Sequence, residues 1–272
     1  MPQQRPRKRF AQHFLHDLLV IDHIIAAIAP APGQCMVEIG PGTGALTLSL
    51  LQHVGELHVV ELDRDLAAEL VRRCRGAGTL HMHCQDALDF DIRDLVADGK
   101  TIRVIGNLPY NISTPLIFHL LEAADRIQDM VFMLQEEVVD RMCAEPGTKV
   151  YGRLSVMVQA QCRVEKLFTV SAESFTPPPK VSSAIVRLIP QMQTGIQDYG
   201  AFADIVRQSF NQRRKTLRNA LKDMVGAQQF SNLGIDPGMR PEQLTVAQFI
   251  SIANCVAGGW GLGAKKIETG ST

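Results

Sequence analysis

The residue types best suited to chemistry stand together after an apolar run at 102–105. They are Asn107, Leu108, Pro109 and Tyr110. The side-chain oxygen of Asn107 and the carbonyl of Leu108 can accept hydrogen bonds from an amino group, whereas Pro109 has no N–H to donate. Tyr110 offers a ring on which a base can stack. This set suits group transfer to the exocyclic amine of a flat base; the alternative is a plain turn, because Asn and Pro are common turn residues.

A second candidate site stands upstream, in the glycine-rich segment VEIGPGTG at 37–44. Glycines such as Gly40 allow the backbone to approach a ligand closely. Glu61 ends the next apolar run, about 20 residues further on, where an acid can accept hydrogen bonds from ribose hydroxyls. Gly40, Gly42 and Ala45 also satisfy the loose dinucleotide-binding pattern, so this motif alone does not distinguish the cofactor.

Two further residues favour a different nucleoside cofactor. Pro41 removes a backbone N–H from the turn in which a pyrophosphate would need donors. Asp86 follows the third apolar run, where its carboxylate can accept a hydrogen bond from an adenine amine. Acids after successive strands, with Asn107 after the fourth, are the layout of an S-adenosylmethionine site. Carboxylates cost less near its sulfonium cation than near a pyrophosphate, so a dehydrogenase is the weaker alternative.

The elements that must position these residues alternate between apolar strand-like runs and helical patterns. Strands are expected at 35–40, 57–62, 80–85, 102–105 and 130–135, with helices at 45–52, 65–74 and 136–143. This alternation predicts an α/β fold with a parallel, doubly wound, Rossmann-like sheet. Strand-like runs at 155–162 and 183–189 predict an antiparallel edge. Ligands of such sheets bind at the carboxyl ends of strands, where the candidate residues stand.

The sequence divides into two expected domains. Residues 1–190, with a basic N-terminal arm at 1–16, form the predicted cofactor-binding domain. Residues 191–272 begin with a polar linker and continue with a helical pattern at 202–222 and a capping box at 245–248, which predicts a small helical domain. The apolar fraction of 46% is enough for a sizeable core in the larger domain.

Basic residues gather in two places although the net charge is zero. The segments 1–9 and 207–222 contain no acidic residue. Such local clusters indicate an anionic partner such as RNA, although charge runs are also common on solvated faces. The candidate RNA-binding residues are Arg7, Lys8, Arg9, Arg213, Arg214, Lys215, Arg218 and Lys222.

The pattern of cysteines and the hydropathy of the sequence argue against several classes of protein. The six cysteines form no Cys-x-x-Cys pair, which argues against a disulfide framework or a zinc ribbon and fits a reducing cytoplasm. No apolar run approaches the ~18 residues of a membrane span, and no secretory signal follows the basic N-terminus. His81, His83 and Cys84 resemble part of a metal cluster, but no further ligand spacing lies near them in the sequence, so no metal is expected.

The segments described above are similar to those of one known family, the small-subunit (16S) ribosomal RNA adenine dimethyltransferases. The similarity runs from residue 8 to about residue 257. It rests on RFAQHFL at 9–15, VEIGPGTG at 37–44, NLPYNI at 107–112, FTPPPKV at 175–181 and FNQRRKTL at 210–217. The last two are long and specific. Relatives that methylate large-subunit RNA share the third and fourth segments, whereas the fifth favours the small-subunit branch.

The resemblance implies a reaction, a cofactor and roles for particular residues. S-adenosylmethionine would donate methyl groups to two adjacent adenines in the 3′-terminal hairpin of 16S ribosomal RNA, giving dimethyladenosine during small-subunit maturation. The resemblance further implies that His13 and Leu15 close over the cofactor and that it is bound by Gly40, Glu61, Asp86 and Asn107. Many relatives carry Asn at position 13, which leaves a role for the His13 side chain open.

The target adenine would be flipped out of its helix, because its amine cannot be reached in a stack. Tyr110 would stack on one face and Phe175 would cover the other; a core position is the alternative for Phe175, since aromatic residues are mostly buried. A monomer is the default. A factor that only binds the maturing subunit is the alternative from another class, and the intact Asn107, Pro109 and Tyr110 argue against loss of catalysis.

Overall fold

The computed structural model describes residues 13–97, 99–211 and 215–260. The chain forms two compact units, one made of Met1–Asp140 and Cys162–Met192, the other of Arg141–Gln161 and Gln193–Thr272. The domain boundary expected at residue 190 had left 141–161 in the first domain, whereas the structure groups these residues with the C-terminal helices. Two hydrogen bonds explain this grouping. The hydroxyl of Tyr151 donates to the carbonyl of Leu244 (2.9 Å), and the Gly147 N–H donates to the carbonyl of Glu242 (2.6 Å).

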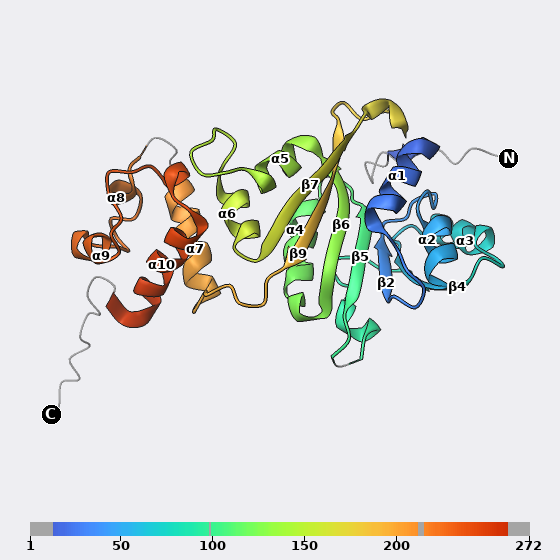
Figure 1. The fold of residues 1–272 in the computed structure, drawn as a ribbon, viewed down its shortest axis with the longest axis horizontal. Helices are drawn as coiled ribbons and strands as arrows, with labels where there is room; N and C mark the ends of the chain where they lie inside the picture. Colours follow the sequence, from blue (N-terminus) through green and yellow to red (C-terminus); the bar gives the residue numbers. More distant parts are fainter. Residues whose placement is uncertain (1–12, 98, 212–214, 261–272) are drawn as a thin grey trace. The chain divides into compact units, whose positions relative to one another are not determined.

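The first unit is built on a sheet of seven strands in the order β4-β3-β2-β5-β6-β9-β7 (Figure 1). The strands are β2 (Met36–Ile39), β3 (Glu56–Val60), β4 (Thr79–His83), β5 (Ile102–Asn107), β6 (Ile127–Gln135), β7 (Cys162–Val170) and β9 (Ser183–Pro190). Neighbours from β4 to β6 are parallel, whereas β9 is antiparallel to both β6 and β7. The predicted α/β fold with an antiparallel edge is confirmed. The strand order reverses at β2, which has β3 on one side and β5 on the other. Such sheets bind ligands at the point of reversal.

Helices α1 to α5 accompany this sheet. Their bounds are α1 (Leu18–Ile28), α2 (Thr47–Val54), α3 (Arg64–Arg73), α4 (Ser113–Leu121) and α5 (Glu136–Cys143). Apolar side chains of α1 and α2 form one buried cluster with inward-facing residues of β2, β3, β5, β6 and β9. Alternate residues of β5 and β6, such as Val104 and Phe132, are buried outside that cluster. Burial on both faces is typical of parallel sheets and explains the nearly continuous apolar runs of these strands.

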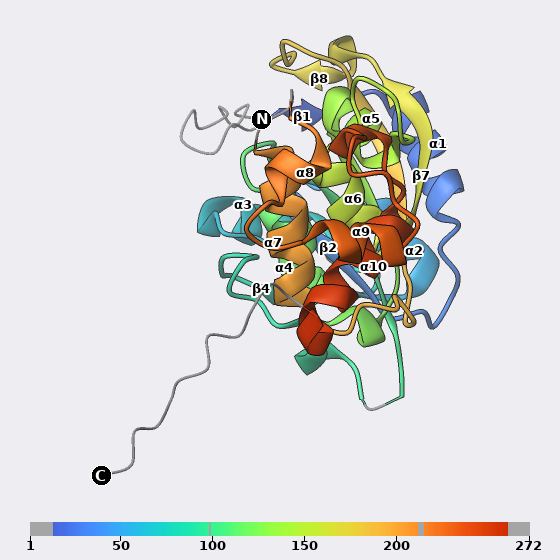
Figure 2. The same ribbon diagram turned by 90° about the vertical axis from the view of Figure 1, so that its left-hand side faces the viewer.

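A short sheet of two strands joins segments far apart in the sequence. β1 (Phe14–Leu15) pairs antiparallel with β8 (Phe175–Thr176), and the two lie side by side in Figure 2. The pairing continues through a hydrogen bond from the His16 N–H to the carbonyl of Ser174 (3.0 Å). It therefore places the segment at 9–15, as far as it is described, beside the segment at 175–181.

One strand expectation was wrong. Residues 155–162 were expected to form a strand, but α6 (Arg153–Gln159) covers most of that run and β7 begins only at Cys162. Ser155 accepts a hydrogen bond from the Gly152 N–H (3.0 Å), which satisfies a donor at the start of the helix. Residues 155–158 are all buried. A helix that is apolar all round cannot be distinguished from a buried strand by periodicity.

The second unit is helical. Besides α6 it contains α7 (Tyr199–Phe210), α8 (Leu217–Ala220), α9 (Ala227–Asn232) and α10 (Val246–Cys255). The helical pattern at 202–222 is divided between two helices: α7 ends at Phe210, and Thr216 has extended backbone before α8. The capping box at 245–248 is confirmed, since Thr245 and Gln248 exchange hydrogen bonds of 2.9 and 3.2 Å. Across the described parts of both units, no helix combines the length and apolarity that crossing a membrane requires.

Candidate active site

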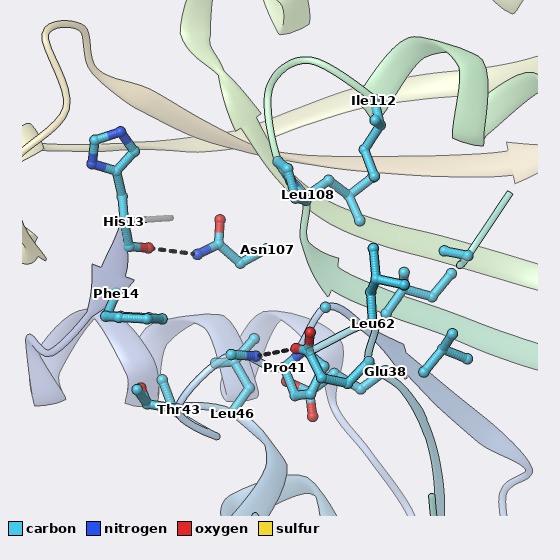
Figure 3. A pocket seen from close by; sticks show the side chains of 18 of the residues that line it. His13, Phe14, Glu38, Pro41, Thr43, Leu46, Leu62, Asn107, Leu108 and Ile112 are labelled. Carbon is cyan, nitrogen blue, oxygen red and sulfur yellow. Dashed lines mark hydrogen bonds between the residues drawn. The ribbon is translucent and has the colours of Figure 1, made fainter. Parts of the chain in front are cut away.

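A cavity of about 310 Å³ opens at the carboxyl ends of the central strands (Figure 3). It lies entirely within the first unit. Every residue predicted for catalysis or cofactor binding lines it, namely His13, Leu15, Gly40, Glu61, Asp86, Asn107, Leu108, Pro109, Tyr110 and Phe175. The cavity therefore brings together residues that are up to 162 positions apart in the sequence, which run from His13 to Phe175.

In the glycine turn between β2 and α2, three backbone N–H groups already donate hydrogen bonds within the protein. The N–H of Gly40 donates to Val60 (2.9 Å), that of Gly42 to Oε2 of Glu61 (3.2 Å) and that of Gly44 to Pro41 (2.9 Å). The φ angles of Gly40 and Gly42 are 65° and 56°, in the left-handed region that favours glycine. A pyrophosphate needs free backbone donors. Because these three are used and Pro41 has none, the turn fits a dinucleotide poorly.

Two carboxylates follow the next two strands. Glu61, after β3, is buried and accepts hydrogen bonds from the N–H groups of Gly42 and Asp63 (3.2 and 2.9 Å). Burial raises the pKa of Glu61 above its usual value. Asp86, after β4, is half-buried and accepts one bond from the Leu88 N–H (3.0 Å). Each carboxylate oxygen has two lone pairs, so both side chains keep acceptor capacity toward ribose hydroxyls or an adenine amine.

Glu38 is a further acid of the cavity; it stands in the glycine-rich segment at 37–44, but it was not among the predicted cofactor-binding residues. Its residue is 2% exposed, and Oε2 has no hydrogen-bond partner among the described residues. Burial raises the pKa of Glu38 to about 7. A buried carboxylate without a partner is costly unless a ligand satisfies it. Its position just before the glycine turn is the only sequence signal that could have identified it.

The cavity fits S-adenosylmethionine by the chemistry of its donor set. The acid at Glu38, whose Oε2 has no partner among the described residues, suits the cationic amino-acid part, and two acceptor carboxylates suit the ribose and the adenine amine. The glycine turn has few free backbone N–H donors, so it does not suit a phosphate group. Phe14, which the prediction also omitted, lies over this turn: a Cβ at Gly42 would be 3.3 Å from the Phe14 ring.

Asn107 is oriented by the N-terminal segment. Its Nδ2 donates to the carbonyl of His13 (3.4 Å), as Figure 3 shows. Because that carbonyl is an acceptor, the amide nitrogen must face it, and Oδ1 is turned the other way. No described residue donates a hydrogen bond to Oδ1. Leu108 is fixed through its N–H, which donates to the carbonyl of Met133 in β6 (3.2 Å).

The two aromatic candidates differ in exposure. Tyr110 is half-buried, and its hydroxyl is 2.9 Å from Oγ of Ser183 in β9, a partner that the sequence did not indicate. Its ring lies 6.1 Å from that of His13, with 28° between the planes. Phe175 is only 2% exposed and belongs to the buried cluster while lining the cavity. Its burial is what the core alternative predicts, and it leaves little of the ring to cover a base.

His13 contributes through its backbone and its ring. Its carbonyl accepts from Asn107, and its ring nitrogen Nδ1 is 2.7 Å from the carbonyl of Pro177. The backbone contact does not depend on the side chain at position 13. Leu15 is buried, lines the cavity and belongs to the same cluster as Phe175.

The candidate RNA-binding residues are described only in part. Lys215, Arg218 and Lys222 are exposed in the second unit. Arg207, the first cation of the basic segment 207–222, pairs with Asp204 one helical turn earlier (2.9 Å). The other candidates lie outside the described residues: Arg7, Lys8, Arg9, Arg213 and Arg214.

Comparisons with known proteins show the family of this chain. A sequence model of the family described as "Ribosomal RNA adenine dimethylase" matches residues 3–258. The chain is 54% identical over 250 residues to the ribosomal RNA small subunit methyltransferase A of Nitrosococcus oceani, covering 91% of this chain and 95% of that protein. It is 55% identical over 262 residues to the protein of that name from Chromohalobacter salexigens, covering 94% and 93%.

Solved structures show the same fold. A dimethyladenosine transferase from Plasmodium falciparum superposes with a TM-score of 0.80 at 26% identity, covering 92% of this chain and all of that one. The 23S ribosomal RNA methyltransferase ErmE shares the fold with a TM-score of 0.69 at 23% identity, covering 90% and 99%. With a family match over nearly the whole chain and relatives above 50% identity, this chain belongs to the ribosomal RNA adenine dimethylase family.

Proposed function

We propose that this chain transfers methyl groups from S-adenosylmethionine to the exocyclic amine of adenines in small-subunit ribosomal RNA. One observation carries the proposal. A single cavity joins the amine acceptors at Asn107 and Leu108 to three carboxylates suited to the cofactor. Membership of the family supplies the reaction, and the small-subunit relatives support the choice of ribosomal RNA.

The cofactor would be held by residues from successive strand ends. Glu61 would accept hydrogen bonds from the ribose hydroxyls and Asp86 from the adenine amine, and Glu38 would face the cationic amino-acid part; all three line the cavity. When bound, S-adenosylmethionine supplies an electrophilic methyl group on a positively charged sulfur. Phe14 and Leu15, which belong to the β1–β8 pair, line the cavity and would close over the bound cofactor.

Asn107 and Leu108 would activate the target amine by orientation. The adenine amine is a poor nucleophile because its lone pair is delocalised into the ring. Hydrogen bonds from its N–H groups to Oδ1 of Asn107 and to the Leu108 carbonyl favour a pyramidal nitrogen whose lone pair points at the methyl group. Orientation of this kind can supply on the order of 7–11 kcal/mol. The methylated amine carries a positive charge and loses its proton readily, so no strong base is required.

The finer substrate assignment rests on the resemblance of the sequence to the small-subunit branch. The proposed targets are two adjacent adenines of the 3′-terminal hairpin of 16S ribosomal RNA, each dimethylated during subunit maturation. Tyr110 would stack on the flipped base. The basic residues of the second unit and of the N-terminal arm would bind phosphates, and the protein would act as a monomer in the cytoplasm.

The test is methyl transfer from labelled S-adenosylmethionine to under-methylated small ribosomal subunits, with naked RNA and large subunits alongside. Digested RNA is analysed for dimethyladenosine. We expect dimethyladenosine only with small subunits. Label in large-subunit RNA would instead indicate the 23S branch. Tight binding to small subunits without any label would favour a non-catalytic assembly factor.

A further inference from the structure

A cluster of imidazole and carboxylate groups covers one face of the two strands at the edge of the sheet. β3 and β4 are parallel, and His58 is the register partner of His81. Alternate residues of a strand point to the same side. Glu56 and His58 of β3 therefore share a face with His81 and His83 of β4, whereas Leu57 points into the buried cluster on the other side.

The side chains of this cluster are close enough to share one ion. One ligand atom each from Glu56, His58 and His81 lies within 4.8 Å of the other two. Oε1 of Glu56 is 2.7 Å from Nε2 of His81, and the rings of His58 and His81 stack with centroids 4.6 Å apart. Two strands thus supply three potential ligand atoms that lie within 4.8 Å of one another. The sequence had shown only the β4 members of this set.

A neighbouring imidazole fixes the orientation of His58. Nδ1 of His58 is 3.1 Å from Nε2 of His83. The His83 ring in turn packs against Phe90, with centroids 5.0 Å apart. Partners of this kind hold a ligating imidazole in one plane, and their loss typically weakens metal binding.

The cluster is open to an entering ion. The side chains of His81 and Glu56 are 40% and 64% exposed. Zinc binds nitrogen and oxygen ligands at bond lengths of about 2.0–2.1 Å. In a tetrahedral site, two ligand atoms are then about 3.3 Å apart. The 2.7 Å hydrogen bond between Glu56 and His81 must therefore widen slightly, which two exposed side chains can do by small rotations.

We propose that Glu56, His58 and His81 bind one divalent transition-metal ion of the zinc class, with His83 as a positioning residue. Imidazole and carboxylate are ligands that zinc takes in sites with three protein groups, and water occupies the fourth place. Hard cations such as magnesium prefer oxygen ligands and do not suit two imidazoles. This site goes beyond the proposed methyl transfer and does not depend on it.

A bound ion would tie the edge strand to the rest of the sheet. Among the described strands, β4 is hydrogen-bonded only to β3. Glu61 and Asp86 follow these two strands and line the cofactor cavity. The ion would therefore stabilise the part of the sheet that carries both acids, and heat or denaturant resistance should rise with zinc concentration.

The test is equilibrium dialysis of the full chain against micromolar zinc chloride at about pH 7.5, where imidazoles are largely neutral, followed by elemental analysis. We expect one saturable ion per chain. His58→Gln and His81→Gln should each lower the affinity at least ~10-fold, and His83→Gln by about 10-fold. His53→Gln is the matched control, because His53 is an exposed imidazole on α2 outside the cluster. It should leave the affinity unchanged.

Three results would overturn the proposal: no saturable binding by the wild-type chain, equal affinity of the wild type and His81→Gln, or loss of the ion in Cys84→Ser. The last would assign binding to the exposed thiol of Cys84. Circular dichroism of the zinc-free variants shows whether each is folded. Glu56→Gln, which changes an exposed side chain, provides a second cluster variant and should also weaken binding.

Discussion

At the scale of single residues, Asn107 shows how a backbone contact can orient a side chain that is proposed to act in catalysis. The carbonyl of His13 holds the amide nitrogen, so the amide oxygen keeps one direction without a substrate. A preoriented acceptor costs no reorganisation when the amine arrives. The His13 contact comes from the main chain, so another side chain at position 13 would preserve it.

Replacing Asn107 tests this role. Asn107→Ala should reduce methyl transfer to small subunits on the order of 100-fold, the cost typical of one preorganised hydrogen-bonding group. Cofactor affinity, measured by calorimetry, should change little, because the carboxylates remain. Asn232→Ala, at the end of α9, is the control and should be fully active, since its amide oxygen accepts from Gln228 on the surface of the second unit. Near-normal transfer by Asn107→Ala would contradict the assigned role.

Glu38 makes stability depend on pH in the cofactor-free protein. Burial raises its pKa from the usual 4.5 to about 7, so the folded state favours the protonated form. The stability that this preference contributes is complete below pH 4.5 and is lost as pH rises to about 7. Above that value the ionised carboxylate costs up to about 3 kcal/mol, at roughly 1.4 kcal/mol for each unit of pKa shift.

Glu38→Gln should remove that dependence. In urea unfolding, the variant should match the wild type at about pH 4.5 and be more stable by as much as ~3 kcal/mol at about pH 8. Glu165→Gln, an exposed acid of β7, should show no such difference between the two pH values. If the difference in unfolding free energy between the wild type and Glu38→Gln were the same at both pH values, the raised pKa would be refuted.

At the scale of elements, the antiparallel edge contributes to the site through Ser183. This residue begins β9, and its hydroxyl is bonded to the hydroxyl of Tyr110 after β5. The bond anchors the tip of a ring that is otherwise half-buried. β9, which lies between β6 and the edge strand β7, thus helps to position the proposed stacking surface for the target base.

Removal of either hydroxyl should have the same effect. Ser183→Ala and Tyr110→Phe should each raise the KM for the RNA substrate a few-fold, and the double variant should be no worse than either single one. Non-additivity is expected because both changes break one hydrogen bond. Tyr110→Ala should be far more damaging because it also removes the ring. Additive losses in the double variant would show that the two hydroxyls act separately.

The short β1–β8 pair is a second example at this scale. Phe14 and Leu15 pair with Phe175 and Thr176, so one two-stranded sheet carries the closing residues of the cavity. Each two-residue strand is too short for any periodicity to predict it. The resemblance had named both segments but not their contact.

At the scale of the whole molecule, the charge is balanced overall but uneven locally. Lys215, Arg218 and Lys222 are exposed on the second unit, whereas Arg207 is paired with Asp204. Among the described residues these three cations form no ion pair, so none has to be broken before they bind a phosphate. In the proposed function, the first unit carries out the methyl transfer and the second unit contacts the RNA.

Replacing all three exposed cations with Ala should weaken binding to small subunits. The slope of log affinity against log salt should fall by about 1 for each phosphate that the variant no longer neutralises. Cofactor affinity should be unchanged, since the cavity lies within the first unit. Arg207→Ala serves as control and should bind with the wild-type salt slope. Equal slopes for the triple variant and the wild type would assign those side chains to a solvated face.

Sequence alone predicted the α/β fold and those cavity residues that follow the strand ends, such as Glu61, Asp86 and Asn107. Parallel strands have apolar runs, and the ligand-binding residues follow them directly, so local order in the chain predicted position in space. The resemblance added His13, Leu15 and Phe175, which no strand end would have indicated. It did not indicate Ser183, because a hydroxyl at the start of a strand carries no signal of its own.

What the sequence by itself determined were features that depend on neighbouring residues: the glycine turn, the acids after the strands, the Asn-Leu-Pro-Tyr segment and the capping box. Only the tertiary structure decided the helix at Arg153–Gln159, the burial of Phe175 and the meeting of Glu56 and His58 with His81. The physical reason is that these features arise from packing and register between distant segments. Composition and periodicity describe one segment at a time, so they cannot contain that information.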